Sequence, residues 1–98
     1  MKVIKEAEGN VLKVKVEGRV DTTTAPKFQQ EIEDALDGIT ELIFDLAKME
    51  YISSAGLRVF LSVHKRMTKQ GSMLLKNVTE TVMEIFDITG FSDILNIE

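Results

Sequence analysis

The composition of this 98-residue chain is that of an acidic globular protein. Apolar residues make up 44% of the chain and charged residues 29%, which excludes a disordered or collagen-like protein and suffices for one buried core. Asp and Glu outnumber Lys and Arg by 16 to 12, so the overall field repels phosphate backbones and argues against a nucleic-acid partner. The absence of cysteine excludes disulfides and thiolate zinc sites. No segment approaches the roughly 20 apolar residues needed to cross a bilayer, and the N-terminus lacks an apolar leader. We therefore expect a cytoplasmic protein that does not bind membranes.

The first quarter of the chain predicts a β-hairpin. A short β-branched segment precedes residues 8–10 (EGN), a turn-forming cluster, and residues 11–17 then alternate apolar and charged side chains. We expect Gly18 to end this second strand. A threonine-rich loop follows, and apolar residues at helical spacing predict a first helix over residues 25–36, with Pro26 in its first turn.

Residues 41–45 (ELIFD) form a compact apolar segment that predicts a central strand buried on both faces. A second helix is expected to begin at Ser53 or Ser54, since apolar residues from Leu57 onward share one helical stripe. Gln70 and the following glycine supply its end.

The last third of the chain predicts another short strand over residues 72–76 and a third helix around residues 82–86 that stops before Thr89. Residues 91–95 are expected to form a short apolar helical turn. The resulting order, β β α β α β α, predicts an α/β fold with a mixed β-sheet and helices packed against it. No linker or repeat divides the chain, so we expect one domain over residues 1–98.

Ser53 and Ser54 stand where a short loop is expected to lead into the second helix. Helix N-termini leave backbone N–H groups without partners and carry partial positive charge, so a phosphate added here would not melt the helix. Serine is also a common N-cap, and from the residues alone either serine could serve only that purpose. We expect Ala55 and Gly56 to keep the turn open to another protein's active site.

Three segments together resemble the STAS family, in particular the bacterial anti-sigma factor antagonists. Residues 18–25 (GRVDTTTA) resemble the family's segment between its second strand and first helix. Residues 45–57 (DLAKMEYISSAGL) are similar to the signature that ends in D-S-S/T/A-G-L, and residues 86–91 (FDITGF) resemble the close of the third helix. The first or the third segment would be a weak signal alone; the three in register are a strong one.

The resemblance implies a STAS-like fold and a protein-binding module that is not an enzyme. The serine two residues before the glycine, Ser54 here, would be the phosphoacceptor, with Ser53 the less favoured choice. In its unmodified form the protein would bind an anti-sigma factor that is also a serine kinase, and thereby free a sigma factor. Phosphorylation with ATP would break that complex and a serine phosphatase would restore it. The expected partner-binding residues are Asp21, Thr22, Thr23, Ser53, Ser54, Ala55, Gly56, Leu57 and Arg58.

The chain departs from this family pattern at two positions. Many members have aspartate just before the acceptor, where this chain has Ser53, which leaves kinase specificity open. Many have serine or threonine just after it, where this chain has Ala55, so that Ser53 is the only adjacent competitor.

Other candidate residues favour structural roles. His64 is the only histidine and has no partner in the sequence that would make it a catalytic base or metal ligand. Asp45 ends a strand, where a turn role is expected. Four methionines at apolar positions are interpreted as core residues: Met49, Met67, Met73 and Met83. Four basic residues of the second helix are interpreted as a solvated face that could complement an acidic partner: Arg58, Lys65, Arg66 and Lys69.

Two other functions are alternatives to the phosphorylation switch. A STAS-type scaffolding or transporter-associated module would bind its partner constitutively. An enzyme has little support, since the sequence has no Cys/His pair, glycine-rich phosphate loop or Ser/His/acid set at plausible spacing. We expect no cofactor, no metal and a monomer.

Overall fold

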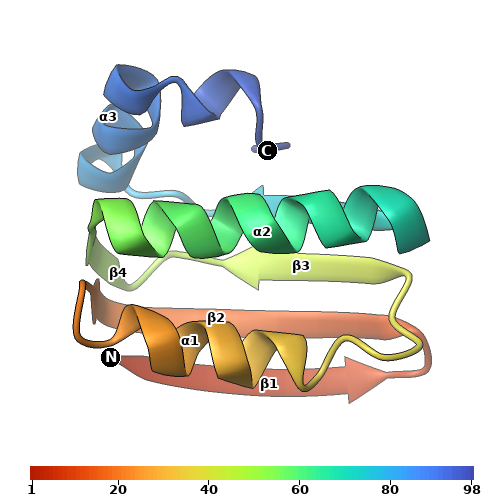
Figure 1. The fold of residues 1–98 in the computed structure, drawn as a ribbon. Coiled ribbons are helices and arrows are strands. Elements are labelled where there is room, and N and C mark those ends of the chain that lie inside the picture. The colour runs from red at the N-terminus through yellow and green to blue at the C-terminus, as the bar shows by residue number, and fades with distance from the viewer.

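The computed structural model describes residues 1–98 and contains one mixed β-sheet with helices α1 and α2 across one face (Figure 1). Helix α3 packs against β4 and lies beside α2. The elements in chain order are β1 (Lys2–Glu8), β2 (Val11–Val20), α1 (Ala25–Glu33), β3 (Glu41–Asp45), β4 (Met49–Ile52), α2 (Ser54–Gln70), β5 (Ser72–Lys76), α3 (Glu80–Thr89) and the 3₁₀ turn η1 (Phe91–Asp93).

The sheet has the strand order β1-β2-β3-β5, and β4 pairs with the far end of β2. Strands β1 and β2 are antiparallel and are joined by a turn in which Gly9 has a φ of +61°. The pairs β2–β3, β2–β4 and β3–β5 are parallel. The predicted α/β class and mixed sheet are confirmed. No helix is both long enough and apolar enough to span a bilayer.

Strand β2 is longer than the sequence suggested, because Gly18 does not end it. Its first half pairs with β3 as far as Lys15 opposite Asp45, and its second half pairs with β4 from Gly18 onward. Gly18 has a φ of +84° and the register shifts between it and Arg19. Glycine adopts this left-handed conformation without strain, so β2 continues past the irregularity as a partner of β4.

Strand β4 was missing from the predicted order, which placed its residues in a loop. It is only four residues long, with Met49 and Ile52 buried and Glu50 exposed between them. Such a short segment lacks the alternation that identifies a strand in sequence. Its backbone hydrogen-bonding partner is the continuation of β2 beyond the bulge.

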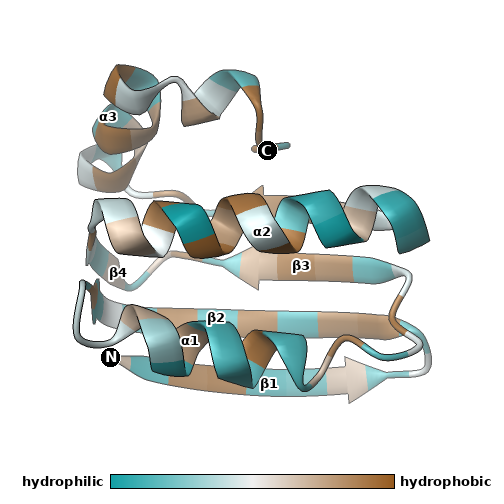
Figure 2. Ribbon diagram, viewed as in Figure 1, coloured by the Kyte–Doolittle hydropathy of each residue, from teal (hydrophilic) through white to brown (hydrophobic).

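The core lies between the sheet and the helices and is centred on four fully buried phenylalanines. The ring centroids of Phe44 and Phe60 are 5.0 Å apart, and those of Phe28 and Phe60 are 5.5 Å apart. Phe86 of α3 contacts Phe60 edge-on at 6.3 Å, which ties α3 to the same core. Such offset and edge-on contacts stabilise aromatic pairs beyond their buried area. Hydrophilic and hydrophobic bands alternate along α1 and α2 in Figure 2, as this one-sided packing requires.

The expectation that β3 is buried on both faces was wrong. Leu42 and Phe44 are buried beneath the helices, but Ile43 on the opposite face is only half-buried. No helix covers that face, where Lys13 and Lys15 of the neighbouring strand are exposed. Of the four methionines expected in the core, Met83 is half-buried and the other three are buried.

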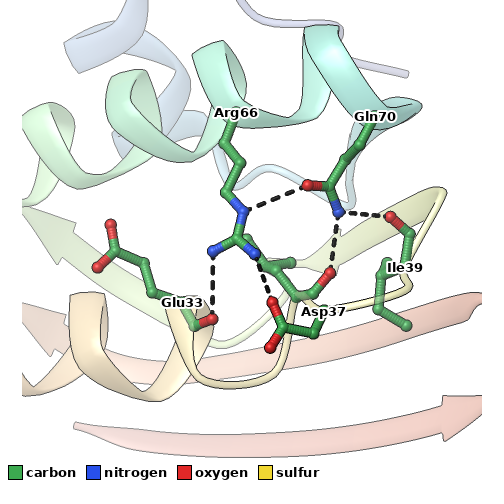
Figure 3. A network of polar contacts seen from close by, with 6 residues as sticks. Glu33, Asp37, Ile39, Arg66 and Gln70 are labelled. Carbon is green, nitrogen blue, oxygen red and sulfur yellow. Dashed lines mark hydrogen bonds and ion pairs between the residues drawn. The ribbon is translucent and has the colours of Figure 1, made fainter.

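Helix α1 ends at Glu33, three residues earlier than predicted, although Leu36 is fully buried. A polar network from α2 holds the segment that follows (Figure 3). Gln70 Nε2 donates to the carbonyl oxygens of Leu36 at 2.9 Å and Ile39 at 2.6 Å. Arg66 donates to the Glu33 carbonyl oxygen at 3.3 Å and forms an ion pair with Asp37 at 3.0 Å. These two side chains thus donate hydrogen bonds to three backbone carbonyls at and beyond the end of α1.

Replacing Gln70 with alanine should lower the free energy of unfolding by about 1–2 kcal/mol, because the Ile39 carbonyl loses its donor and the Leu36 carbonyl keeps only the Ile39 N–H. Urea unfolding monitored by circular dichroism would measure this loss. Lys69→Ala is the matched control, since Lys69 is exposed, makes no side-chain hydrogen bond, and has a helix propensity close to that of Gln. Equal stability of the two variants would contradict a structural role for the network.

Candidate functional site

The carboxyl ends of β2 and β4 bring two distant segments to one edge of the sheet. Val20 pairs with Ile52, and the backbone N–H of Ser53 donates to the Val20 carbonyl oxygen at 2.8 Å. The loop beginning at Asp21 therefore starts beside the serine pair. Because α1 and α2 begin directly after these strand ends, both helix N-termini lie at this edge (Figure 1). In open α/β sheets this is the edge where ligands commonly bind.

The structure assigns different roles to the two adjacent serines. Ser53 is the N-cap of α2: its backbone is extended, with φ −88° and ψ 173°, and its hydroxyl oxygen accepts from the Gly56 N–H at 3.4 Å. Its carbonyl oxygen accepts from the Leu57 N–H at 2.9 Å. Ser54 is the first helical residue, is exposed, and makes no side-chain hydrogen bond. The fold therefore uses the hydroxyl of Ser53 and leaves that of Ser54 accessible.

Gly56 lies against the sheet and is buried, so it does not open the outer surface of the turn as expected from the sequence. A β-carbon at this position would stand 2.7 Å from Cγ1 of Ile52 and 2.9 Å from Cγ1 of Val20. Both distances are shorter than real β-carbon contacts. Glycine here allows the first turn of α2 to approach the paired ends of β2 and β4.

Asp21 organises the loop that precedes α1. Its Oδ1 accepts from the backbone N–H groups of Thr23 at 3.0 Å and Thr24 at 3.1 Å, and from their hydroxyls at 2.7 and 3.2 Å. The Thr24 hydroxyl oxygen in turn accepts from the Asp21 N–H at 2.9 Å. The Thr23 hydroxyl, followed by the Thr24 N–H, lowers the pKa of the Asp21 carboxyl below its usual value of 3.8, against a smaller opposing effect of burial. Asp21 is therefore ionised at neutral pH and bonded within its own loop.

The nine predicted partner-binding residues fall into three groups by exposure. The outer group is exposed and consists of Thr22, Thr23, Ser54 and Arg58; the middle group is half-buried and consists of Asp21, Ser53 and Ala55; the inner group is buried and consists of Gly56 and Leu57. Gly56 and Leu57 thus support the site from below, and the accessible surface belongs to the other seven.

Thr24 and the pair formed by Arg19 and Tyr51 were not identified from the sequence. The Arg19 guanidinium lies 4.4 Å from the centroid of the Tyr51 ring, a cation–π contact that the register of β2 and β4 brings about. No sequence signal could have found it, since β4 was not predicted. Thr24 could have been found, because an aspartate followed by threonines two and three residues later is typical of a side-chain-capped turn.

The site presents the Ser54 hydroxyl, which makes no hydrogen bond to any side chain that could act as its base. The Asp21 carboxylate bonds to threonines, and no side chain accepts the Ser54 hydroxyl proton. His64 is half-buried on α2 without a side-chain hydrogen bond, and no three His, Asp or Glu side chains are grouped to hold a metal. Asp45 has the turn role expected for it: it accepts from the Ala47 N–H at 3.0 Å, which is the main cause of its lowered pKa.

Gly56→Ala should lower the free energy of unfolding by about 1–3 kcal/mol, although alanine favours helix by about 1 kcal/mol over glycine. The added methyl group would force Ile52 and Val20 to move. Thermal and urea unfolding would measure the effect. Combining Gly56→Ala with Val20→Ala tests the cause: the double variant should lose less stability than the sum of the two single variants. Additive losses would show that the close approach is not responsible.

Asp21→Asn should destabilise the protein at pH 7, and the difference from the unmodified chain should disappear in acid. A carboxyl whose pKa is lower in the folded than in the unfolded protein stabilises the fold above the unfolded value. This contribution is lost as the pH falls below about 4, through the folded value. Guanidinium unfolding from pH 7 to pH 2 would measure it. Asp93→Asn, at an exposed aspartate without side-chain hydrogen bonds, is the control; parallel pH profiles for the two variants would contradict the prediction.

Comparison with known proteins gives consistent results at the levels of sequence and fold. The family model for the STAS domain matches residues 2–98. The anti-sigma-B factor antagonist of Bacillus subtilis is 34% identical over 89 residues, which cover 90% of this chain and 82% of that protein.

Solved structures resemble this one over nearly its whole length. An anti-sigma factor antagonist from Mycobacterium paratuberculosis has a TM-score of 0.87 at 23% identity, covering 98% of this chain and 83% of that one. Unphosphorylated SpoIIAA has a TM-score of 0.84 at 17% identity, covering 99% and 88%. The phosphorylated form of Bacillus SpoIIAA has a TM-score of 0.76 at 16% identity, covering 99% and 91%. By its sequence match over residues 2–98 and by its fold, the chain belongs to the STAS domain family.

Proposed function

We propose that this protein is an anti-sigma factor antagonist that binds an anti-sigma factor serine kinase in its unmodified form and is released when Ser54 is phosphorylated. The observation that carries the proposal is the exposed Ser54 hydroxyl at the first residue of α2. Because Ser53 already caps the helix, a modification of Ser54 removes no hydrogen bond that the fold uses.

The relatives support the same function. The Bacillus subtilis protein is named an anti-sigma-B factor antagonist, and SpoIIAA, an anti-sigma factor antagonist, has been solved in unphosphorylated and phosphorylated forms. For this chain we infer the same class of partner and the same kind of modification. In this proposal the protein acts in the cytoplasm as a monomer, and a separate serine phosphatase restores the unmodified form.

Phosphoryl transfer here would need catalytic groups from the partner. The Ser54 oxygen would attack the γ-phosphorus of ATP, forming a Ser54 Oγ–P bond while the bond from that phosphorus to the β–γ bridging oxygen breaks and ADP leaves. The hydroxyl proton must pass to a base. Since no side chain of this chain hydrogen-bonds to the Ser54 hydroxyl, and the bonds from Thr23 and Thr24 lower the pKa of Asp21 and so make it a weaker base, we assign that base to the kinase. This chain is then a substrate and a binding partner, not an enzyme.

A phosphate on Ser54 would change the surface more than the fold. It adds about −1.5 to −2 charges at pH 7, next to the positive end of the helix dipole, where negative charge is favourable. The surrounding contact surface is formed by Thr22, Thr23 and Arg58, all of which are exposed. A partner fitted to a small neutral hydroxyl at this position would meet a bulky, doubly charged group, so the complex should dissociate.

Incubation with the cognate kinase and ATP should add one phosphate, which mass spectrometry would locate at Ser54. Ser54→Ala should abolish the modification. Ser53→Ala should still be modified but should lose about 1 kcal/mol of stability, because it removes the N-cap. Ser62→Ala, at an exposed serine of the same helix, is the control: Ser54 should still be modified, and stability should not fall, because alanine favours helix over serine.

A Ser54→Asp variant tests whether phosphorylation acts as a switch. Ser54→Asp should bind the unmodified protein's partner at least about tenfold more weakly, a loss of roughly 1.4 kcal/mol in binding free energy. Isothermal titration calorimetry would measure both affinities. Modification of Ser54→Ala, or unchanged affinity for Ser54→Asp, would reject the switch and favour a STAS module that binds its partner constitutively.

A further inference from the structure

Ser54 and Arg58 lie one turn apart on the exposed side of α2. Positions i and i+4 of a helix are surface neighbours, with β-carbons about 5–6 Å apart. Both residues belong to the continuous helix Ser54–Gln70, and both side chains are exposed. An arginine side chain at i+4 therefore reaches the oxygen of Ser54 without any change in the backbone.

Arg58 differs from the other two arginines in having no partner. Arg66 donates hydrogen bonds to Gln70 and Asp37, and Arg19 stacks on the Tyr51 ring. The Arg58 guanidinium makes no hydrogen bond and no ion pair, and the first turn of α2 contains no acidic residue that could bind it. Its five N–H donors are free for a group added nearby.

We propose that the phosphate on Ser54 is held within the same chain by the Arg58 guanidinium. The inference rests on the proposed function for the presence of that phosphate. Arginine presents two parallel N–H donors that match two phosphate oxygens, and charge-assisted pairs of this kind are among the strongest hydrogen bonds in proteins. Ser54 lies N-terminal to Arg58, which is the favourable order for an anion and a cation on a helix.

The pairing would change the partner-binding surface of this chain at two positions at once. In the unmodified protein the Arg58 guanidinium is free to contact an acidic group of the partner. Once Ser54 carries a phosphate, the same guanidinium is bound in cis and its charge is neutralised. Phosphorylation would thus replace a hydroxyl and also withdraw a cation from the surface.

The charged groups on neighbouring elements are the same in every variant of the test. Asp21 after β2 and Glu50 in β4 add negative charge at this end of the molecule, and Lys27 in the first turn of α1 adds positive charge. The Asp21 carboxylate is already bonded to Thr23 and Thr24 and offers the phosphate no donor. Among these charged groups, only Arg58 lies on α2, one turn from Ser54 on the same helix face.

The test uses the full chain with phosphoserine incorporated at position 54 during translation, so that no kinase is needed. The ³¹P NMR shift of the phosphate is followed from pH 4 to pH 8. Arg58→Gln should move the titration midpoint upward by roughly half a pH unit, because the guanidinium favours the dianion. Arg58→Lys should give a smaller shift, since it keeps the charge but loses the two-pronged contact.

Lys65→Gln is the matched control for this titration. Lys65 is exposed on α2 and its change removes one positive charge, but it lies eleven residues, about 16 Å along the helix, from position 54. We expect the titration midpoint of Lys65→Gln to stay within about 0.1 pH unit of that of the phosphorylated chain without substitutions, because salt screens the interaction between charges this far apart. An unchanged midpoint in Arg58→Gln, or an equal shift in Lys65→Gln, would overturn the pairing.

The two proposals can fail separately. If the kinase does not modify Ser54, the function proposed above fails, while the translated phosphoserine still reports whether Arg58 binds it. If the NMR midpoint does not respond to Arg58, the pairing fails, and mass spectrometry of the kinase reaction is unaffected by that result.

Discussion

The parallel pairing of β4 with the end of β2 is the constraint on which the site depends. The hydrogen bond from the Ser53 N–H to the Val20 carbonyl oxygen fixes the point where β4 gives way to α2. The same pairing fixes the point where β2 gives way to the loop before α1. Ala25 and Ser54, which are 29 positions apart in the chain, thus begin two helices side by side. The absence of a β-carbon at Gly56 lets α2 pack directly onto the ends of β2 and β4.

In the site, some side chains form hydrogen bonds that stabilise the fold, and neighbouring ones form none. Ser53 uses its hydroxyl and its carbonyl oxygen to start the helix and its N–H to bind β2, and Asp21 uses one carboxylate oxygen to hold the loop of threonines in place. Ser54 and Arg58 make no such contribution, since neither side chain forms a hydrogen bond within the fold. The residues left free by the fold are those that can change state or meet a partner without unfolding the protein.

The far end of α2 is also bonded to the rest of the fold. There Arg66 and Gln70 donate hydrogen bonds to the end of α1 and the segment between α1 and β3. Between the two ends of α2, Phe60 packs against phenylalanines from α1, β3 and α3. The exposed turn at the start of α2 is therefore carried by a helix that is fixed along its length, and a modification there would act on the surface and not on the packing.

The sequence by itself determined the fold class, most element positions and the presence of a serine pair at the start of the long helix. Apolar residues at spacings of 2 and 3.6 place the strands and helices whatever their partners are, and a serine pair before such a helix marks its start. The sequence did not show which serine is the cap, that β2 continues past Gly18, that β4 exists, or that Gly56 faces inward. Each of these depends on which strand lies next to which, and that is decided by contacts between residues far apart in the chain, which a local pattern cannot contain. The tertiary structure alone therefore assigned the hydroxyl of Ser53 to the fold and left that of Ser54 exposed to solvent.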